Sequence, residues 1–332
     1  MSKSAVDFRA VILAGGSGER FWPISTPERP KQFLRVFGGE SLVRQSVSRI
    51  GDLVSPSDVF VVTGRHLVPA TRKELPELPR ANIVGEPMRR DTGAAVALGV
   101  GVAARGDCVL GFFPADQLVT DVKAFRKALR SAVAKAARSD TVVVLGIKPE
   151  YPATGFGYVD PKTGRFHEKP SSAKARAYLR EGYLWNAGMF VARASVFRKV
   201  LADHAPARSP LAALGGRRLN SLSSVYGGLP RISFDYAVME KLSRVEVIPA
   251  DCGWDDVGGY GAFDRYFPHD SHGNVREGPC TVVESDGNIC VARSARISLL
   301  GVRNLVVVTT PDSVLVADKS RVSEMKKLFA KP

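Results

Sequence analysis

The chain has 332 residues, of which 45% are hydrophobic and 24% charged, and it carries a net charge of +14. The composition is that of a globular protein, and the length predicts one large domain with a smaller one. No apolar run reaches the ~18 residues that a membrane span needs, so we expect no membrane association. The 47 basic residues are scattered and form no basic helix, so we expect no nucleic-acid partner. The basic excess either serves solubility or attracts a small polyanion such as a triphosphate.

The four cysteines include no pair with the CxxC spacing of a zinc site or redox motif. Most of them lie in apolar stretches, which predicts buried free thiols in a reducing compartment. The short apolar stretch near the N-terminus runs directly into a glycine-rich segment. We therefore expect a strand there and not a signal peptide, and we expect the protein to be cytoplasmic.

The first two thirds of the chain alternates apolar runs with amphipathic stretches. Strands are predicted at residues 9–13, 59–63, 108–113, 141–147 and 246–249. Helices are predicted at residues 41–50, 92–104, 122–137, 173–180 and 235–242, with short strands and loops within residues 154–192. Continuous apolar strands separated by helices predict an α/β fold, a Rossmann-like and mostly parallel sheet with helices on both faces.

A polar, turn-rich stretch, PHDSHGN, precedes a different pattern of short apolar runs. Strands are predicted at residues 281–283, 289–292, 297–299, 305–309 and 314–316, followed by a helix at 322–329. They indicate a small β module, a β-helix or a β-roll, although no strict hexapeptide repeat is visible. We therefore predict two domains, residues 1–273 and residues 274–332.

The first predicted strand leads into LAGGSGERFWP at residues 13–23. Gly15, Gly16 and Gly18 let main-chain N–H groups approach a phosphate closely, and Arg20 adds a forked cation. The third glycine of a dinucleotide-binding fingerprint is missing, and no Gly-Lys-Ser/Thr follows as a P-loop requires. The segment predicts a phosphate-binding loop of another kind.

The letters FWP end this loop, and PKQF follows at residues 30–33. Together these stretches resemble the signature of the sugar-nucleotide pyrophosphorylases, nucleotidyltransferases with a GT-A-like fold, and most closely the mannose-1-phosphate guanylyltransferases among them. The resemblance implies that the loop, with Leu13 and Ala14 at its start, wraps a triphosphate. It also implies that Arg20 and Lys31 neutralise the phosphates.

The segment GEPMRRDT at residues 85–92 is similar to the family's EPxxRNTAPA segment, which lies near the base. The resemblance implies nucleotide contacts from Glu86, Arg90, Asp91 and Thr92. The sequence departs from the family where Asp91 replaces asparagine and where Gly-Ala replaces Ala-Pro. The Asp91 carboxylate either accepts hydrogen bonds from guanine N1 and N2 or caps the helix that starts at Thr92.

PAD at residues 114–116 and GWDDVG at residues 253–258 are similar to the family's PADH and WxDVG metal motifs, with glutamine replacing histidine in the first. The resemblance implies that Asp116 and Asp256 bind Mg²⁺. Magnesium prefers one or two carboxylates together with phosphate and water oxygens. Asp255 is expected to face the solvent.

FHEKP and YLWNAGMF are similar to the family's F-x-EKP and YLWNxGMF motifs. The resemblance implies that Glu168 accepts hydrogen bonds from sugar hydroxyls and that Lys169 pairs with the sugar phosphate. It further implies that Asn186 hydrogen-bonds the sugar and that Gly188 leaves room for it.

Two shorter matches complete the predicted sugar site. The segment GFGY places Gly157 against the sugar ring, and SFDYAVME resembles the family's SIDYAVME helix. We interpret that helix mainly as scaffold, with Asp235 as a further candidate site residue. Trp185, Met189 and Phe190 in the neighbouring motif are expected to pack in the core.

The resemblance implies transfer of GMP from GTP to mannose 1-phosphate, with Mg²⁺ as cofactor and a homodimer as the assembly. Two alternatives stay open. One is a pyrophosphorylase for another pair, such as glucose 1-phosphate with dTTP, and the other is a non-catalytic subunit that binds nucleotide sugar. The arginine, the lysines and both metal-motif aspartates are present, which favours an enzyme.

Overall fold

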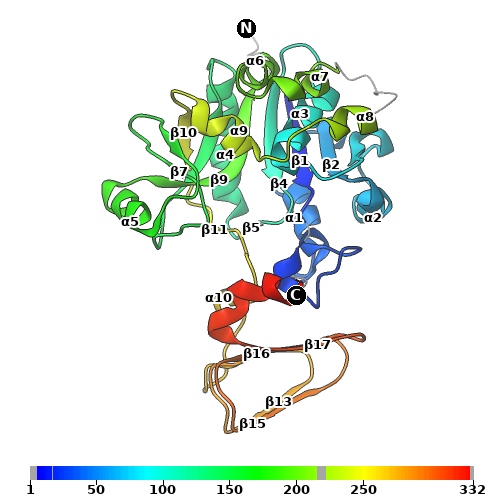
Figure 1. Ribbon diagram of the computed structural model, residues 1–332, viewed down its shortest axis with the longest axis vertical. Helices are drawn as coiled ribbons and strands as arrows, with labels where there is room; N and C mark the ends of the chain where they lie inside the picture. The colour runs from blue at the N-terminus through cyan, green and yellow to red at the C-terminus, as the bar shows by residue number, and fades with distance from the viewer. Residues whose placement is uncertain (1–5, 17, 215–221, 330–332) are drawn as a thin grey trace. The chain divides into compact units, whose positions relative to one another are not determined.

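The computed structural model describes residues 6–16, 18–214 and 222–329, and within them the chain forms two compact units (Figure 1). The first unit comprises residues 1–15 and 43–254, and the second comprises residues 16–42 and 255–332. The segment after the first strand therefore belongs to the same unit as the C-terminal part of the chain. The domain boundary between residues 273 and 274 stays a prediction.

A mostly parallel sheet forms the centre of the first unit, as predicted. The strands of this part of the chain are β1 (Phe8–Ala14), β2 (Val59–Gly64), β3 (Ile83–Glu86), β4 (Val109–Pro114), β5 (Leu118–Val119), β6 (Val143–Ile147), β7 (Tyr158–Val159), β8 (Phe166–His167), β9 (Leu184–Arg193), β10 (Glu246–Pro249) and β11 (Trp254–Asp255). The order in the sheet is β10-β6-β9-β4-β1-β2-β3, with β7 and β8 beside β9. Only β9, among the described strands of this path, runs antiparallel to its neighbours β4 and β6.

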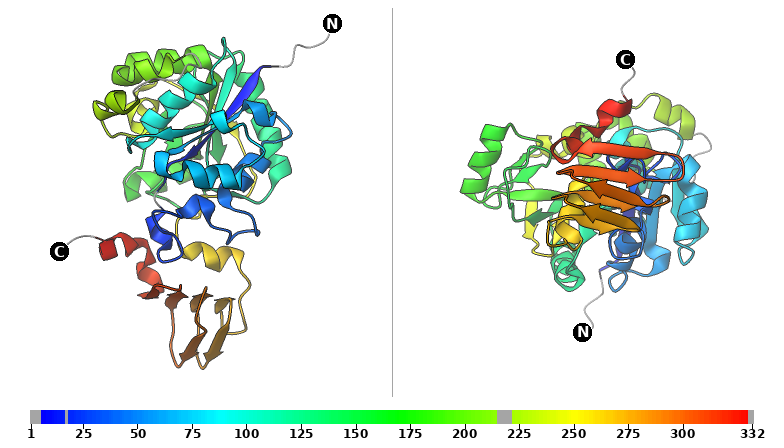
Figure 2. Two further views of the ribbon diagram at one scale, coloured as in Figure 1. Left: turned by 90° about the vertical axis from the view of Figure 1, so that its right-hand side faces the viewer. Right: turned by 90° about the horizontal axis from the view of Figure 1, so that it is seen from below.

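Helices cover both faces of the sheet (Figures 1 and 2). They are α1 (Leu42–Ser48), α2 (Val68–Glu74), α3 (Asp91–Ala103), α4 (Val122–Ala136), α5 (Ser172–Glu181), α6 (Ala194–His204), α7 (Ser209–Ala212), α8 (Leu222–Gly227) and α9 (Phe234–Ala237). Successive side chains of a strand point to opposite faces. Accordingly Phe112 of β4 lies against Gly99 of α3, while Phe113 packs edge-to-face with Phe125 of α4.

Helix α3 packs unusually close to its neighbours. A Cβ added at Gly99 would lie 2.6 Å from a ring atom of Phe112, and one added at Gly101 would lie 1.9 Å from the carbonyl oxygen of Leu211. Glycine in a helix interior costs about 1 kcal/mol relative to alanine. The close packing of α3 against β4 and α7 explains why the sequence accepts that cost.

Three predicted elements differ from the observed ones. Residues 184–193 form the single ten-residue strand β9, where short strands and loops were expected, because its side chains are buried along nearly its whole length. The helix predicted at 235–242 is α9 followed by a separate 3-10 turn, Met239–Lys241, since Val238 leaves helical geometry. The helix predicted at 322–329 is a 3-10 segment, Lys319–Phe329.

Aromatic side chains join the two parts of the second unit. Phe21 packs edge-to-face with Tyr260 at 5.6 Å between ring centroids, and Phe37 packs against Phe263 of α10 (Gly261–Tyr266) at 5.7 Å. The Tyr260 hydroxyl also donates to the main-chain oxygen of Phe21. Buried aromatic pairs contribute about 0.5–1.5 kcal/mol beyond their area. This cluster explains why residues 16–42 belong to the second unit.

The C-terminal β module is a stack of short strands, as predicted. Its strands are β12 (Val275–Glu277), β13 (Cys280–Val283), β14 (Ile289–Ala292), β15 (Ile297–Leu300), β16 (Leu305–Thr309) and β17 (Val314–Asp318). One sheet has the order β12-β14-β16-β17 and the other pairs β13 with β15 (Figure 2). The pairs are parallel except β16–β17, so successive turns of the chain stack on one another as in a β-helix.

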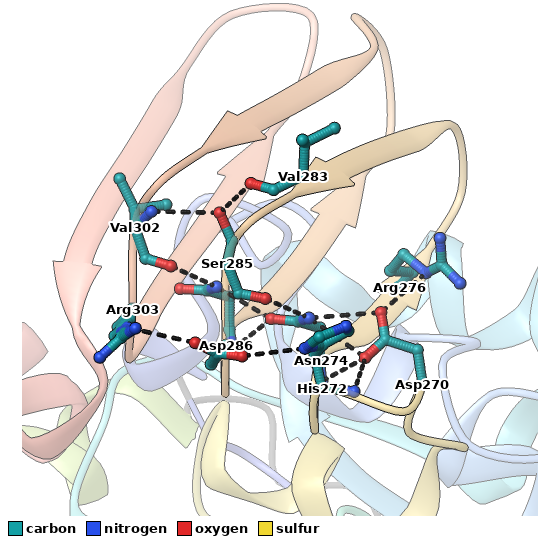
Figure 3. Close-up of polar contacts among 10 residues, drawn as sticks. Asp270, His272, Asn274, Arg276, Val283, Ser285, Asp286, Val302 and Arg303 are labelled. Carbon is teal, nitrogen blue, oxygen red and sulfur yellow. Dashed lines mark hydrogen bonds and ion pairs between the residues drawn. The ribbon is translucent and has the colours of Figure 1, made fainter.

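A ladder of buried amides holds successive turns of this module together (Figure 3). The Oδ1 atom of Asn274 accepts hydrogen bonds from both the main-chain N and the Nδ2 of Asn288, each at 2.9 Å. Asn288 in turn accepts from Leu305 N at 2.9 Å and donates to Val302 O at 3.2 Å. Each asparagine follows a turn residue, Gly273 or Gly287. The two asparagines are 14 residues apart, so the ladder does not follow a hexapeptide repeat.

We predict that Asn288→Ala loosens the module. The substitution removes three side-chain hydrogen bonds and leaves the main-chain N of Leu305 without its acceptor, at about 1–3 kcal/mol, while Asn274 Oδ1 keeps its bond from the main-chain N of Asn288. Hydrogen exchange at the amides of β14 and β16 should therefore accelerate by about tenfold or more. The control is Arg303→Ala, which removes an exposed ion pair to Asp286 worth less than about 1 kcal/mol. Equal exchange in both variants would contradict the role given to the ladder.

Candidate active site

A cavity of about 350 Å³ opens where β1, β2 and β3 end. Parallel strands present their carboxyl ends at one edge of the sheet, which is where open α/β sheets bind ligands. Gly15 follows β1, Gly64 ends β2 and Glu86 ends β3, and all three line the cavity. The other lining residues are Arg65, His66, Leu67, Pro87, Met88 and Arg89.

The Glu86 carboxyl group is buried at the wall of this cavity. Burial raises the pKa of Glu86 to about 7, the hydrogen bond from Tyr226 acts in the opposite direction, and the charge of Asp91 raises it further. The Tyr226 hydroxyl donates to Glu86 Oε1 at 3.1 Å. A Cβ added at Gly15 would lie 3.6 Å from Glu86 Oε2, so that oxygen lies beside the start of the glycine loop. Tyr226 was not among the predicted site residues, because no motif marks it.

The polar groups of Arg90 and Thr92 engage the segment around α8 and α9. Arg90 donates from Nε to the carbonyl oxygen of Tyr226 at 2.8 Å and from Nη2 to that of Gly227 at 3.1 Å. Thr92 accepts a hydrogen bond from Phe234 N at 2.9 Å. In the described structure these two predicted nucleotide-binding residues therefore bind the main chain of residues 226–234 through hydrogen bonds. Their direct contact with a nucleotide stays a prediction.

Asp91 does not cap helix α3. The helix begins at Asp91 itself with Arg90 as its N-cap, and within the described chain no side chain caps it. The Asp91 carboxylate instead forms an exposed ion pair with Arg231 at 3.3 Å. Of the two alternatives for Asp91, the helix cap is therefore wrong, because its carboxylate makes no capping hydrogen bond.

The glycine loop and Lys31 form one assembly in the second unit. Gly18 has a φ of 66°, and a Cβ added there would lie 2.4 Å from the main-chain N of Lys31. The buried Lys31 donates from Nζ to the main-chain oxygen of Asp256 at 2.6 Å. An atom added as Cβ on Gly258 would lie 3.4 Å from Arg20 Nη1 and 3.2 Å from Asp256 Oδ2. The structure thus brings the two predicted cations of the loop region together with one predicted metal ligand.

Asp255 does not face the solvent, which corrects the expectation from the sequence. Its side chain is only 17% exposed and forms a two-point ion pair with Arg265, at 2.8 and 3.1 Å. It also accepts from the Tyr266 hydroxyl at 2.9 Å and from Val257 N at 2.6 Å. Asp255 therefore anchors the turn on which Asp256 lies.

Asp116 follows β4 in a loop that a buried arginine holds. Arg49 donates from Nη1 to Gln117 O at 2.9 Å and from Nη2 to Pro114 O at 3.2 Å. Burial lowers the pKa of Arg49 to about 10, against the effect of the Asp116 carboxylate. Sequence reasoning missed Arg49. The available signal was a lone arginine among the apolar positions of a predicted helix.

Gln117, which replaces the family's histidine, uses both ends of its amide. Its Nε2 donates to Ala187 O at 2.8 Å, and its Oε1 accepts from the Trp254 indole at 2.9 Å. The glutamine therefore ties the Asp116 loop to β9 and to the start of the GWDDVG motif. A histidine nitrogen and its N–H could make the same kind of paired contact.

The predicted sugar-site residues Gly157, Glu168 and Lys169 lie together in the first unit. The Glu168 side chain is 6% exposed and pairs with the half-exposed Lys169 at 2.7 Å between Oε1 and Nζ. Partial burial acts to lower the pKa of Lys169, but the Glu168 carboxylate raises it overall. A Cβ added at Gly157 would lie 2.7 Å from Glu168 Oε2, so a side chain there would displace the carboxylate.

Asn186 and Gly188 belong to the same cluster, together with Asp235. Asn186 donates from Nδ2 to Asp235 Oδ1 at 3.0 Å and accepts from Gly188 N at 3.1 Å. Burial, and then the charge of Glu168, raise the pKa of Asp235. Glu240 accepts from Glu168 N at 3.1 Å and was not predicted as a site residue. Asp235 is therefore part of the site's framework and not only of a scaffold helix.

Leu13 and Ala14 lie at the end of β1. Their carbonyl oxygens accept hydrogen bonds from Ala115 N at 3.0 Å and from the Thr63 hydroxyl at 2.9 Å. Gly16 follows as the first residue of the second unit and is exposed. These contacts fix the point at which the glycine loop leaves the sheet.

The fold, the cavity at Glu86 and the cluster of Glu168, Lys169 and Asn186 together define a nucleotidyltransferase. The family model for nucleotidyl transferase matches residues 9–271, and the model for a MannoseP isomerase/GMP-like beta-helix domain matches residues 278–331. The chain therefore belongs to the nucleotidyl transferase family, and its C-terminal module matches the beta-helix domain.

Several individual proteins are similar to this chain over nearly its whole length. Xanthan biosynthesis protein XanB of Xanthomonas campestris is 36% identical over 98% of this chain and 73% of its own length. A mannose-1-phosphate guanylyltransferase of Klebsiella pneumoniae is 34% identical over 96% of this chain and 72% of its own. A crystal structure described as mannose-1-phosphate geranyltransferase from Thermus thermophilus is 36% identical, has a TM-score of 0.87, and covers 97% of this chain and 98% of its own.

Within the described residues, every helix is too short or too polar to cross a lipid bilayer.

We predict that Gly18→Ala disrupts the phosphate loop. Alanine would carry the cost of left-handed geometry, about 1–2 kcal/mol, and its Cβ would also displace the Lys31 main chain. Triphosphate binding should weaken by about tenfold or more, and the melting temperature should fall. The matched control is Gly39→Ala, which has a φ of 80° but no described atom within 4 Å of its added Cβ. Equal losses in both variants would contradict the role of the Lys31 contact.

Proposed function

We propose that this chain is a mannose-1-phosphate guanylyltransferase, which makes GDP-mannose and pyrophosphate from GTP and mannose 1-phosphate. The observation that carries the proposal is that the first unit contains two groups of residues suited to bind ligands. One is the cavity lined by Glu86 at the ends of the parallel strands. The other is the cluster around Lys169, Glu168 and Asn186. The relatives that carry this enzyme's name support the choice of substrates.

The reaction is a substitution at phosphorus. An oxygen of the mannose 1-phosphate attacks the α-phosphorus of GTP and forms the new P–O bond. The bond between the α-phosphorus and the α–β bridging oxygen breaks, and pyrophosphate leaves with that oxygen. The attacking oxygen is already anionic, so the reaction needs no general base. The difficulty lies in bringing two polyanions together, which calls for positioning and charge neutralisation.

The cations of the chain supply that neutralisation. Arg20 and Lys31 serve the triphosphate, together with main-chain N–H groups of the glycine loop. Lys169 binds the phosphate of mannose 1-phosphate. Glu168 accepts hydrogen bonds from the sugar hydroxyls, and Asn186 donates to them. Because Glu168 is paired with Lys169 in the free enzyme, the sugar phosphate competes with this carboxylate for the ammonium group.

The metal in this proposal is Mg²⁺, held by Asp116 and Asp256. Within the described residues no group of three or more His, Cys, Asp or Glu side chains could hold a metal ion. A pair of carboxylates suits a hard cation that takes its other ligands from phosphates and water. When bound, the ion would neutralise charge on the phosphates. A homodimer is part of the same proposal, on the family resemblance alone.

The base assignment depends on Glu86 rather than on Asp91. Guanine offers two neighbouring donors, N1–H and the N2 amine, and a carboxylate can accept from both. The Glu86 carboxyl lines the cavity, whereas the Asp91 carboxylate is paired with Arg231. The departure of Asp91 from the family sequence therefore does not weaken the choice of GTP.

The proposal is tested by an activity matrix with Mg²⁺. GTP, ATP, dTTP and UTP are combined with mannose 1-phosphate and glucose 1-phosphate, and pyrophosphate release is measured. We expect the highest kcat/KM for GTP with mannose 1-phosphate. A preference for another pair would replace the proposed substrates, and no release with any pair would favour a non-catalytic protein that binds nucleotide sugar.

We predict that Lys169→Ala and Asp256→Ala each lower kcat/KM by roughly 10²-fold or more, the usual effect of losing one preorganised electrostatic contact. The Asp256 variant keeps the hydrogen bond to Lys31, because that bond uses the main-chain oxygen. It therefore tests the carboxylate alone. The control is Lys199→Ala, which removes an exposed lysine paired with Asp203 and should leave the kinetics unchanged. Wild-type kinetics in the Lys169 or Asp256 variant would refute the assigned role.

A further inference from the structure

We propose that Tyr226 is a positioning residue that fixes the Glu86 carboxylate for guanine and thereby sets the base specificity of the site. The inference rests on the proposed function, since it concerns how GTP is chosen over other triphosphates. Tyr226 lies 140 residues from Glu86 in the sequence and reaches it from α8.

The geometry gives the two oxygens of Glu86 different surroundings. The Tyr226 hydroxyl donates a buried hydrogen bond to Oε1 at 3.1 Å. Oε2 lies 3.6 Å from the point that a Cβ added to Gly15 would occupy, and both residues line the cavity. With one oxygen held by a donor that the core fixes, rotation of the carboxyl group is restricted. The Oε2 side then has a constant position relative to the cavity.

The position of the hydroxyl is itself well determined. The Tyr226 side chain is fully buried in the main hydrophobic core of the first unit. Arg90 clamps the main chain of α8 through the carbonyl oxygens of Tyr226 and Gly227, at 2.8 and 3.1 Å. Because the Tyr226 ring is buried and its main chain is held by Arg90, the hydroxyl cannot move with the Glu86 carboxylate. The hydrogen bond therefore restricts the rotation of Glu86.

The hydrogen bond also selects the ionised form of Glu86. A hydroxyl that donates to a carboxylate favours the charged state, whereas burial in the wall favours the neutral one. The other charged or titratable residues that line this cavity are Arg65, His66 and Arg89, and the charge of Asp91 also acts on Glu86. An ionised Glu86 accepts from guanine N1–H and N2, but it repels adenine, which presents the N1 acceptor at that edge. A protonated Glu86 would lose this discrimination.

The test compares wild type, Tyr226→Phe and Tyr158→Phe. Tyr158 is a matched control, because it is equally buried and its hydroxyl donates to Ala153 O at 2.9 Å. The kcat/KM values for GTP, inosine triphosphate and ATP are measured with mannose 1-phosphate across pH 5.5–9. Inosine triphosphate keeps N1–H but lacks the N2 amine. Glu86→Gln and the double variant identify which part of the pH profile belongs to Glu86, since the substrate phosphates also titrate.

We expect the wild-type kcat/KM for GTP to rise with pH through about 7, as Glu86 ionises. Without the hydroxyl the pKa of Glu86 is higher, so Tyr226→Phe should move this limb upward by about one pH unit. At pH 7 the preference for GTP over inosine triphosphate and over ATP should fall by about tenfold, mainly through KM. The Tyr158 variant should keep both the limb and the preference. In the Glu86→Gln background, Tyr226→Phe should move neither.

Two other results would separate the possible failures. A Tyr226 variant with the wild-type limb and preference would overturn the inference while leaving the proposed function intact. A wild-type enzyme without a preference for GTP would overturn the proposed function itself. If Tyr226→Phe is too unstable to assay, the single variant Glu86→Gln still decides. A wild-type pH limb and preference in that variant would show that Glu86 does not read the base.

Discussion

The hydrogen bond from Lys31 Nζ to the main-chain oxygen of Asp256 is the contact on which the proposed phosphate site of this protein depends. It joins motifs more than two hundred residues apart, and its lysine is buried. The glycine loop folds against the same lysine, since Gly18 leaves no room for a side chain beside the Lys31 main chain. Asp255 holds the neighbouring turn through Arg265 and Tyr266. One assembly thus fixes a cation, a loop of main-chain donors and a carboxylate before any polyanion arrives, which is what electrostatic preorganisation requires.

The first unit places its carboxylates by a related principle. Glu86, Glu168 and Asp235 are removed from water to different degrees, and each has a specific donor: a tyrosine hydroxyl, a lysine ammonium or an asparagine amide. Buried carboxylates without such donors would be protonated or would move. In the proposed function, the donors therefore set both the direction and the charge of the groups that face the base and the sugar ring. In the same proposal, the cations of the glycine loop and Lys169 remain for the phosphates.

Much of the fold follows from the sequence, because buried parallel strands read as continuous apolar runs. The predicted strands at 59–63 and 108–113 agree closely with β2 and β4, which are buried along nearly their whole length. β9 was not predicted as one strand, since its glycine and asparagine suggest loops until tertiary burial decides. Gly157, Glu168 and Asn186, from separate motifs, lie together in the structure, while their contacts with a sugar stay a prediction. Tyr226 could not be predicted, because its role comes from a contact across 140 residues, and the contacts of Arg49 across 68 residues were signalled only by its place in a predicted helix.

The central claim is that the sugar phosphate attacks the α-phosphorus of GTP. Its most direct test uses mannose 1-phosphate labelled with ¹⁸O in its three non-bridging phosphate oxygens, followed by ³¹P NMR and mass spectrometry of the products. The account predicts that all of the label appears in GDP-mannose, one labelled oxygen bridging the two phosphorus atoms, and that pyrophosphate contains none. Label in the pyrophosphate, or consumption of GTP without a labelled GDP-sugar, would contradict it.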